Sequence, residues 1–458
     1  MRLIRGWRGA RPAARPNGGA PRPATWDPYA SAGVPSERRH APPERPARVV
    51  IISASAGAGH EGASRELAHR LRSRGFEVDC RDLADIFPYG LGKLLRGTYH
   101  GMLSRFPWIY GSLFAIGCNF TGAGPITRAL LRPVRAQVRQ LVGPDTRAVV
   151  STYPIATQLL GPLRRKGQLG VPVITYLTDF AVNPLWVSPG VDVYCAAHPT
   201  SRGQARALGA TEVRVVGRLV SAGFGPGTAQ ARRHAREHFG LPAQGRLALL
   251  VAGSWGVGEV ATTAAEIART GVATPVVVCG HNEALYRRLR RQRVAHVFGW
   301  VDDMPALLQA ADVLVENAGG LTALEAMASG LPVVTYRPIP GHGRANAVTM
   351  AQAGMVSWVR RAEDLGPALV ELTDGVRGRE QRDAGLELFE SDPARVVADV
   401  ARGVEALPNP LPRPSSRTRG GRGRRARRAG VLVCLAVAAL NWYAHHHAQQ
   451  PTPPGRRR

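Results

Sequence analysis

The chain has 458 residues, enough for two domains of ordinary size, and a formal net charge of +27 at neutral pH. Residues 1–48 contribute +7 and residues 408–458 contribute +11, so the extreme charge belongs mainly to tails rich in Pro, Gly and Arg. Such tails cannot bury enough apolar surface to fold; we predict a disordered basic tail over 1–47, a basic linker over 408–428 and a tail over 445–458. They attract phosphates of any kind, which fits an anionic membrane surface and specifies no nucleic acid.

The five cysteines are scattered without paired spacing, at Cys80, Cys118, Cys195, Cys279 and Cys434. This pattern indicates neither a zinc site nor a disulfide framework, and a reducing cytoplasm is the simplest location. The N-terminus lacks an apolar stretch of signal-peptide length, so we expect no export signal.

A first Rossmann-like domain is predicted over residues 48–220. It begins with a buried strand over 49–52, a glycine-rich turn, a helix from about Glu61 to Arg74 and a second strand over 76–80. Strand, helix and strand in this order form a βαβ unit. Further strands of this domain are predicted at 148–151, 173–177, 192–196 and 213–216.

The turn after the first strand admits two interpretations. Gly57, Gly59 and Gly62 match the dinucleotide fingerprint G-x-G-x-x-G, and Asp79 lies about where such folds hold a ribose. Dinucleotide binding leaves His60 unexplained, and the second half of the chain has a better-formed nucleotide turn. A His at the carboxyl end of a first strand suggests a base facing a cleft; the alternative is an imidazole that caps the helix or packs.

Residues 87–120 contain eight aromatic side chains, among them Tyr99, Trp108 and Tyr110, with basic residues interleaved. Amphipathic helices of this composition fit a membrane interface or a groove for acyl chains. The same pattern equally fits a helical insertion that packs on its own core.

A hinge is predicted over residues 221–245, and a second Rossmann-like domain over 246–407. Its strands are predicted at 247–252, 275–279, 294–298, 311–315 and 333–336. A glycine-rich turn containing Gly256 follows the first of them. Beyond Asp364 the pattern is helical, and we expect the segment from Pro393 to fold back across the first domain.

The stretch from Glu316 to Val334 contains the second nucleotide turn. A buried strand, the pair Gly319–Gly320 and a helix beginning at Leu321 place free backbone N–H groups at a helix N-terminus, where an anion binds favourably. Thr322 can donate its hydroxyl to a phosphate, and Glu325 can accept hydrogen bonds from both hydroxyls of a ribose. The pattern predicts a nucleotide site; the alternative is an ordinary turn with a surface Glu.

Two doubly wound α/β domains with facing carboxyl ends enclose a cleft, which is the expected ligand site. Along them lie the motifs SASAGAGHEGA, TDFAVNPLW, VVVCGHNEALY, GWVDDMPALLQAADVLVENAGGLTALEA and PIPGHGRAN. Over roughly residues 49–355 the chain resembles the monogalactosyldiacylglycerol synthase and processive diacylglycerol glucosyltransferase group, GT-B enzymes related to the peptidoglycan N-acetylglucosaminyltransferase. The resemblance implies inverting transfer from a UDP-sugar to a hydroxyl of a membrane lipid, with diacylglycerol as acceptor and with no metal or cofactor.

The resemblance also implies roles for individual residues. His60 would take the acceptor proton during attack on the anomeric carbon, and the helix end would stabilise the leaving diphosphate. The donor-binding residues would be Gly256, Phe298, Val301, Gly319, Gly320, Leu321, Thr322, Glu325, Gly341, His342 and Asn346, with the uracil beside 298–301. The acceptor side would comprise Gly59, Tyr99, Trp108, Tyr110 and Asp179.

Three positions depart from the pattern of that family. Asn183 stands where a His is usual in TDFAVNPLW, and Gly217-Arg218-Leu219 replaces Gly-Ile-Pro at the hinge. His342-Gly343 replaces the Gln-Glu pair that commonly follows Pro-Gly. The last change bears on which sugar is recognised.

Residues 429–444 form an apolar stretch of sixteen residues after a cluster of eight Arg. A bilayer needs ~20 residues to be spanned comfortably, so the stretch fits a tail anchor or an interfacial helix, and equally a disordered tail with an apolar patch. We expect a cytoplasmic protein, peripheral or tail-anchored at the inner face of the cell membrane. Three alternatives remain open: N-acetylglucosamine transfer to a polyprenyl-linked or other lipid, UDP-sugar epimerisation, and nucleotide-sugar binding without catalysis.

Overall fold

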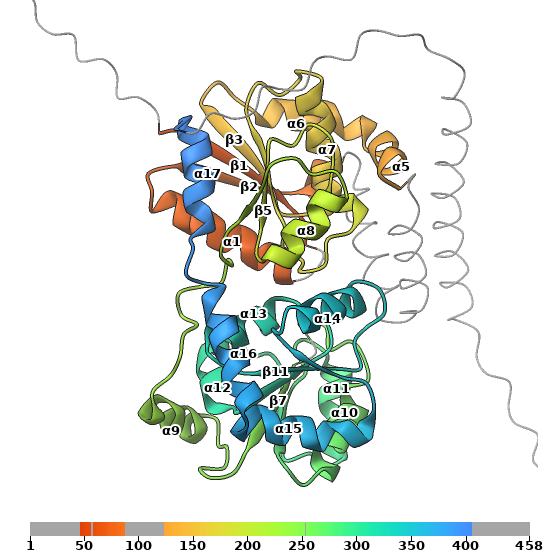
Figure 1. The fold of residues 1–458 in the computed structure, drawn as a ribbon, viewed down its shortest axis with the longest axis vertical. Coiled ribbons are helices and arrows are strands. Elements are labelled where there is room, and N and C mark those ends of the chain that lie inside the picture. Colours follow the sequence, from red (N-terminus) through yellow and green to blue (C-terminus); the bar gives the residue numbers. More distant parts are fainter. Residues whose placement is uncertain (1–45, 56–57, 88–122, 252, 405–458) are drawn as a thin grey trace, which may run out of the picture. The chain divides into compact units, whose positions relative to one another are not determined.

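Two parallel sheets of six strands each, flanked by helices, organise the chain (Figure 1). They lie within residues 46–55, 58–87, 123–251 and 253–404, which are the residues that the computed structural model describes. The predicted α/β class, with two doubly wound Rossmann-like domains of the GT-B type, is confirmed. Residues 1–45 and 405–458, with the predicted tails and the apolar stretch 429–444, lie outside the described residues.

The first sheet has the order β2-β1-β3-β4-β5-β6, and the second has the order β12-β11-β10-β7-β8-β9. We call each sheet with its covering helices a lobe. The strands of the first lobe are β1 Arg48–Ser53, β2 Glu77–Asp82, β3 Thr146–Ser151, β4 Val173–Tyr176, β5 Val193–Ala196 and β6 Val213–Val215. Those of the second are β7 Leu247–Val251, β8 Thr274–Val278, β9 His296–Phe298, β10 Val313–Glu316, β11 Val333–Tyr336 and β12 Ser357–Val359.

Helices precede, join and follow these strands. In the first half of the chain they are α1 Ala58–Arg72, α2 Leu83–Ile86, α5 Ala123–Leu130, α6 Arg135–Leu141, α7 Pro154–Arg165 and α8 Pro199–Ala207, with the short turns η2 Arg132–Val134 and η3 Pro184–Trp186. In the second half they are α9 Ala229–His238, α10 Val260–Arg269, α11 Glu283–Arg291, α12 Met304–Ala310, α13 Leu321–Ala328, α14 His342–Gln352, α15 Leu365–Asp374, α16 Val376–Glu387 and α17 Pro393–Arg402, with the turn η4 Ala362–Asp364. Within the described ranges, every helix is too short or too polar to span a lipid bilayer.

Both faces of each sheet are buried at its central strands, such as β1 and β7, as their uninterrupted apolar sequences require. In β1, Val49 and Ile51 face a core shared with α1 and α17, whereas Val50 and Ile52 face a second core shared with α6 and α7. Alternate residues of a strand point to opposite faces, so an apolar residue at every position needs helices on both sides. Full burial of each such side chain stabilises the fold by about 1.5–3 kcal/mol.

Strand order reverses once in each sheet, and both predicted turns follow a strand at that point. In the first sheet β1 lies between β2 and β3, and in the second β7 lies between β8 and β10. Loops at the carboxyl ends of such neighbouring strands diverge to opposite faces and leave a crevice, where ligands of doubly wound folds bind. The turn before His60 follows β1, and the turn at Gly319 follows β10.

The segment from Pro393 returns to the first lobe, as the sequence predicts. Helix α17 packs beside α1, and Val397 lies in the same core as Leu67 (Figure 1). The chain therefore crosses between the lobes twice, near Gly217 and again near Ser391. A Cβ at Gly217 would collide with the carbonyl oxygen of Ser391, so the two crossings are in backbone contact.

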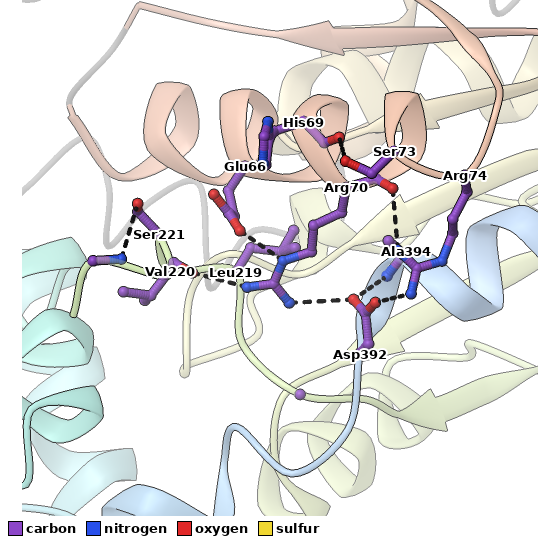
Figure 2. Close-up of polar contacts among 12 residues, drawn as sticks. Glu66, His69, Arg70, Ser73, Arg74, Leu219, Val220, Ser221, Asp392 and Ala394 are labelled. Atoms are coloured by element: carbon purple, nitrogen blue, oxygen red, sulfur yellow. Dashed lines mark hydrogen bonds and ion pairs between the residues drawn. The ribbon is translucent and has the colours of Figure 1, made fainter. Parts of the chain in front are cut away.

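Arg70 of α1 ties both crossings to the first lobe, as Figure 2 shows. Its guanidinium donates to the Glu66 carboxylate at 2.6 Å, to the Asp392 carboxylate at 3.2 Å and to the Val220 carbonyl at 2.8 Å. Arg74 also pairs with Asp392. Because α1 carries His60 at its other end, these bonds link the helix of the candidate base to the chain between the lobes.

We expect Arg70→Met to lower the free energy of unfolding by about 1–3 kcal/mol, because it leaves two carboxylates and a carbonyl without their shared donor. Thermal or denaturant unfolding measures this. Arg65→Met is the control: Arg65 is exposed on the same helix, and its loss should change stability by less than about 0.5 kcal/mol. Equal effects of the two variants would contradict the role given to Arg70.

Candidate functional site

His60 is the third residue of α1, beside the carboxyl end of β1, and one side of its ring is anchored. Its Nδ1 atom lies 3.0 Å from the carbonyl oxygen of Thr152 and 2.8 Å from Oγ1 of Thr178. A carbonyl oxygen only accepts hydrogen bonds, so Nδ1 carries a proton and donates it. In the neutral ring the lone pair is then on Nε2, which is the atom able to act as a base.

Aromatic rings surround this imidazole. The Tyr153 ring meets it edge-on with centroids 5.1 Å apart, and the Trp186 ring lies tilted at 6.2 Å. The indole Nε1 of Trp186 donates to Oδ2 of Asp179 at 3.0 Å. The rings restrict rotation of the imidazole, and the indole holds the Asp179 carboxylate at the same corner of the lobe.

His342 adds an imidazole from the second lobe. It is the first residue of α14, after Gly341, whose φ of 81° places it in the left-handed region. Burial lowers the pKa of His342, the neighbouring Asp179 carboxylate raises it, and positive charge on His60 lowers it. Two imidazoles and one carboxylate, drawn from both lobes, are therefore within electrostatic reach of one another.

Asp179 and His342 of this cluster line a cleft of about 450 Å³. Its walls include Asp179 and Asn183 from the segment after β4, and His342 and Asn346 from α14. A larger hollow of about 560 Å³, around Trp358 beside β12, contains none of the predicted site residues. We therefore locate the candidate active site at the cleft, because Asp179 of the first lobe and His342 of the second lobe both line it.

A buried carboxylate holds the glycine turn before α13. Glu316, the last residue of β10, is 3% exposed and accepts from the N–H of Ala318 at 2.6 Å, from the N–H of Gly319 and from the Thr335 hydroxyl. Burial raises the pKa of Glu316, and these three hydrogen bonds oppose the rise. Two N–H groups of the turn are thus bound by the protein itself and are not available to a phosphate.

The N–H donors that remain for an anion belong to the first turn of α13. Helix hydrogen bonding begins where the N–H of Leu324 meets the carbonyl of Gly320, and Gly320 supplies no side-chain cap. The N–H groups from Leu321 to Ala323 are the unsatisfied donors that every helix N-terminus presents. Thr322, in this turn, is partly exposed. This helix end can bind a phosphate.

Glu325 lies one turn further along α13. Burial raises the pKa of Glu325 to about 7, so the carboxylate and the carboxylic acid are both populated near neutral pH. Removing a carboxylate from water disfavours its charged form, and hydrogen-bond donors brought by a ligand would offset that loss. A ribose, with two adjacent hydroxyls, has the required chemistry.

The N-termini of α1 and α13 face one another. A Cβ on Gly62 would lie 2.7 Å from Cδ2 of Leu321, and a Cβ on Gly59 would lie 3.9 Å from the Leu321 nitrogen. The two predicted turns, far apart in sequence, are therefore neighbours. Leu321 fills the space between them.

Asn346 spans the two lobes. It is 2% exposed, accepts from the Ala181 N–H at 3.0 Å and donates to the Ala318 carbonyl at 3.4 Å. Its amide therefore joins the segment after β4 to the turn before α13. Phe180, next to Ala181 in sequence, packs into the core of the second lobe.

The other predicted donor-binding residues lie at the same carboxyl edge of the second sheet. Gly256 follows β7 with φ of 57°, and its carbonyl accepts from Nδ2 of Asn282 at 3.2 Å. Phe298 ends β9 and, with Val301, packs against the core of that lobe. The acceptor-side residues Tyr99, Trp108 and Tyr110 lie outside the described residues.

No group of three or more His, Cys, Asp or Glu among the described residues is placed to hold a metal ion. In the same part of the chain Cys80, Cys195 and Cys279 are free thiols. Burial raises the pKa of the Cys195 thiol to about 12 and of the Cys279 thiol to about 11, so neither is a nucleophile at neutral pH.

Sequence reasoning gave no role to three residues that the structure brings into the site. Thr152 and Thr178 orient the imidazole, and Glu316 holds the glycine turn. The sequence does carry a signal for Glu316, which is the single acid at the end of an apolar strand. An acid in that position is expected to be buried together with the strand. Nothing in the sequence marks Thr152, which contributes a backbone carbonyl.

Comparison with known proteins matches two families to consecutive parts of the chain. Residues 67–217 match the family described as monogalactosyldiacylglycerol (MGDG) synthase, and residues 246–374 match glycosyl transferases group 1. The chain is 24% identical over 376 residues to a processive diacylglycerol beta-glucosyltransferase of Bacillus cytotoxicus, covering 77% of this chain and 92% of the relative. A protein of the same name from Bacillus mycoides is 26% identical over 395 residues, covering 80% and 96%.

Solved structures show a similar fold. MurG of Acinetobacter baumannii aligns with a TM-score of 0.51 and 18% identity, over 78% of this chain and all of that one. A UDP-glucosyltransferase from Polygonum tinctorium aligns with a TM-score of 0.52 and 15% identity, over 79% and 99%. At these identities the likeness is one of fold.

We expect Gly319→Ala to lower the free energy of unfolding by about 1–3 kcal/mol, because φ of 61° strains an L side chain. Its Cβ would also lie 2.7 Å from Cβ of Asn346. Gly320→Ala is the matched control, since Gly320 has φ of −96° and no atom near the added Cβ, and it should unfold like the parent chain. Thermal unfolding of both variants measures this, and equal midpoints would contradict the explanation.

Proposed function

We propose, on the premise of the confirmed resemblance to the monogalactosyldiacylglycerol synthase and processive diacylglycerol glucosyltransferase family, that this chain is an inverting hexosyltransferase. It moves a hexose from a UDP-sugar to a hydroxyl of a membrane lipid, with diacylglycerol as the acceptor. The observation that carries the proposal is an imidazole with its Nε2 atom left as base, on a helix end that meets the N-terminus of α13 across the lobes.

The proposed reaction uses His60 as general base. The acceptor hydroxyl attacks the anomeric carbon from the face opposite UDP and forms the new glycosidic C–O bond. Its proton passes to Nε2 of His60, while the bond from the anomeric carbon to the diphosphate oxygen breaks and UDP leaves. Thr152 and Thr178 keep the proton of the free imidazole on Nδ1, so that Nε2 can accept. Inversion follows from attack opposite the leaving group.

The leaving diphosphate gains negative charge in the transition state. In the proposal the N–H groups from Leu321 to Ala323 and the hydroxyl of Thr322 donate hydrogen bonds to the diphosphate and stabilise this charge. The helix dipole at the N-terminus of α13 stabilises it as well. Glu316 contributes indirectly by fixing the turn that aims these groups. Since the helix end faces Gly59 closely in this structure, donor entry requires the two lobes to part.

We infer that Glu325 binds the ribose, and that His342, Gly341 and Asn346 lie on the donor side of the cleft. The raised pKa of the Glu325 carboxylate supports the first assignment, because its desolvation is offset when ribose hydroxyls donate to it. The wall of the cleft formed by α14 supports the second. Asp179, on the opposite wall, belongs to the acceptor side of the proposal.

The lipid acceptor requires the enzyme to work at a membrane surface. The relatives named above act on diacylglycerol by name, and the basic tails of this chain would be attracted to anionic lipid at the cytoplasmic face. The proposal is therefore a peripheral or tail-anchored enzyme at that face.

Incubation with labelled UDP-hexoses and vesicles containing diacylglycerol should yield a glycolipid, and His60→Ala should lower kcat at least about 100-fold. Binding of the UDP-sugar, measured by calorimetry, should stay within about threefold of the parent chain. Unchanged turnover in His60→Ala would rule out His60 as the general base.

Controls separate the alternatives. An altered UDP-sugar formed without lipid would indicate an epimerase, and donor binding with no product would indicate a non-catalytic binder. Transfer to a polyprenyl lipid in preference to diacylglycerol would change the acceptor class. A rate that does not depend on anionic lipid in the vesicles would contradict the proposed attraction to an anionic surface.

The affinity for a UDP-hexose should rise with pH around 7, because Glu325 accepts ribose hydroxyls as a carboxylate and its pKa in the free protein is about 7. Below that pH the dissociation constant should rise by up to about tenfold for each pH unit, since the carboxylic acid must lose its proton before the ribose binds. A UDP-hexose does not titrate in this range. Isothermal titrations between pH 5.5 and 8.5 measure the slope.

The same raised pKa has the opposite effect on the stability of the free protein. The free energy of unfolding should decline as the pH rises from near 4.5, the pKa of Glu325 in the unfolded chain, toward 7. Glu325→Gln supplies the control for binding. It cannot ionise, so its affinity should be flat across this range, and a slope that survives in Glu325→Gln would assign the titration to another group.

A further inference from the structure

Arg218 is a buried cation at the first crossing between the lobes. Its side chain is enclosed, with the residue 1% exposed, and its backbone N–H donates to the carbonyl of Leu388 at 2.9 Å. The sequence has Arg here within Gly217-Arg218-Leu219. A charged group is almost never fully buried unless it is paired, so its environment requires an explanation.

The guanidinium makes few contacts for a buried Arg. Nη1 donates to the Thr178 carbonyl at 2.8 Å, and the guanidinium carbon lies 4.4 Å from the centroid of the Phe180 ring. Nε and Nη2 have no hydrogen-bond acceptor among the described residues. The Tyr176 hydroxyl donates to the Gly217 carbonyl and accepts from the Leu219 N–H. Burial lowers the pKa of Arg218, and this hydroxyl lies close enough to the guanidinium to oppose that lowering.

Arg236 of the second lobe shows what a structural buried Arg looks like in the same chain. It is 4% exposed, and its guanidinium pairs with Asp312 at 2.8 Å. It also donates to the carbonyls of four residues, namely Ala310, Pro242, Ala243 and Gly245. Stability alone accounts for Arg236. It does not account for Arg218, whose guanidinium has no hydrogen-bonded carboxylate and far fewer acceptors than that of Arg236 in the described part of the chain.

What Arg218 does contact is the backbone of the candidate site. Thr178, whose carbonyl it binds, touches Nδ1 of His60 through Oγ1. Asp179, the next residue, lines the cleft, and its carboxylate attracts the guanidinium charge. Phe180, under the guanidinium, is fixed in the core of the second lobe. Arg218 therefore holds both flanks of Asp179.

We propose that Arg218 is a positioning residue, which fixes the Thr178–Phe180 segment so that Thr178 Oγ1 and the Thr152 carbonyl keep the imidazole of His60 aimed at the acceptor. The inference rests on the proposed function and deepens it. Because the backbone of Arg218 is bonded to Leu388, the same residue also links the orientation of the base to the crossing that joins the lobes.

A double-mutant cycle tests this. Arg218→Met keeps the length of the side chain but removes the charge and the donors, and Thr178→Val removes only the hydroxyl that touches His60. Each single variant should lower kcat for hexose transfer about 10- to 100-fold, with KM for the UDP-hexose within about twofold. If both act through the imidazole, the double variant should lose little more than the worse single one, because interacting residues are non-additive.

Arg236→Met is the matched control. It removes a better-bonded buried Arg far from the site, so it should lower the unfolding temperature at least as much as Arg218→Met while kcat per folded molecule stays within about twofold. A merely structural role for Arg218 would make the two Met variants behave alike. Should Arg218→Met not fold, Arg218→Lys enters the same cycle, with an intermediate fall in kcat expected.

The outcomes separate this inference from the function it rests on. A parent chain that transfers no hexose removes the proposed function, and the inference with it. A parent chain that transfers hexose, with additive losses in the cycle or with a loss confined to KM, overturns the positioning role alone. Non-additive losses in kcat with an unaltered KM support it.

Discussion

The contact between Nδ1 of His60 and the carbonyl oxygen of Thr152 is the constraint on which the candidate chemistry depends. A carbonyl has no proton to give, so it sets the tautomer of the ring and leaves Nε2 as the acceptor. Thr178 meets the same nitrogen, while Tyr153 and Trp186 restrict the ring. These atoms belong to residues at the carboxyl ends of β1, β3 and β4, which are adjacent strands. Because the sheet is parallel, the three ends lie at the same edge.

The second lobe presents the N-terminus of helix α13 at this place instead of a charged side chain. Glu316 is buried and accepts hydrogen bonds from the N–H groups of Ala318 and Gly319. The turn fixed in this way leaves the remaining N–H donors of α13 directed outward. In the proposal this helix end binds the diphosphate without a cluster of Arg or Lys, because backbone dipoles are already oriented and need no side chain to be ordered. Glu325, whose pKa is raised by burial, lies on the next turn of the same helix and is the residue proposed to bind the ribose.

Contacts between the lobes pass through few residues, and several of them belong to the site. Asn346 bonds both to Ala181 and to Ala318, Phe180 inserts into the core of the second lobe, and Leu321 lies against Gly62. The two crossings of the chain, held by Arg70 and Asp392, lie beside these contacts. Relative motion of the lobes would therefore move the groups proposed to bind donor and acceptor against one another, which couples access to the cleft with alignment of the base.

The sequence by itself determined the alternation of strands and helices, the fold class and the two glycine turns. Apolar runs such as Val49 to Ile52 predict strands buried on both faces, and Gly319 marks a turn whose positive φ few other residues can adopt, so these features are local. Tertiary structure decided the rest. It placed the ends of β1 and β3 side by side, supplied a backbone carbonyl to His60, directed the N–H groups of the Gly319 turn to Glu316, and buried Arg218 against Thr178. Each of these depends on atoms distant in sequence, and a carbonyl oxygen leaves no mark on the identity of the residue that carries it.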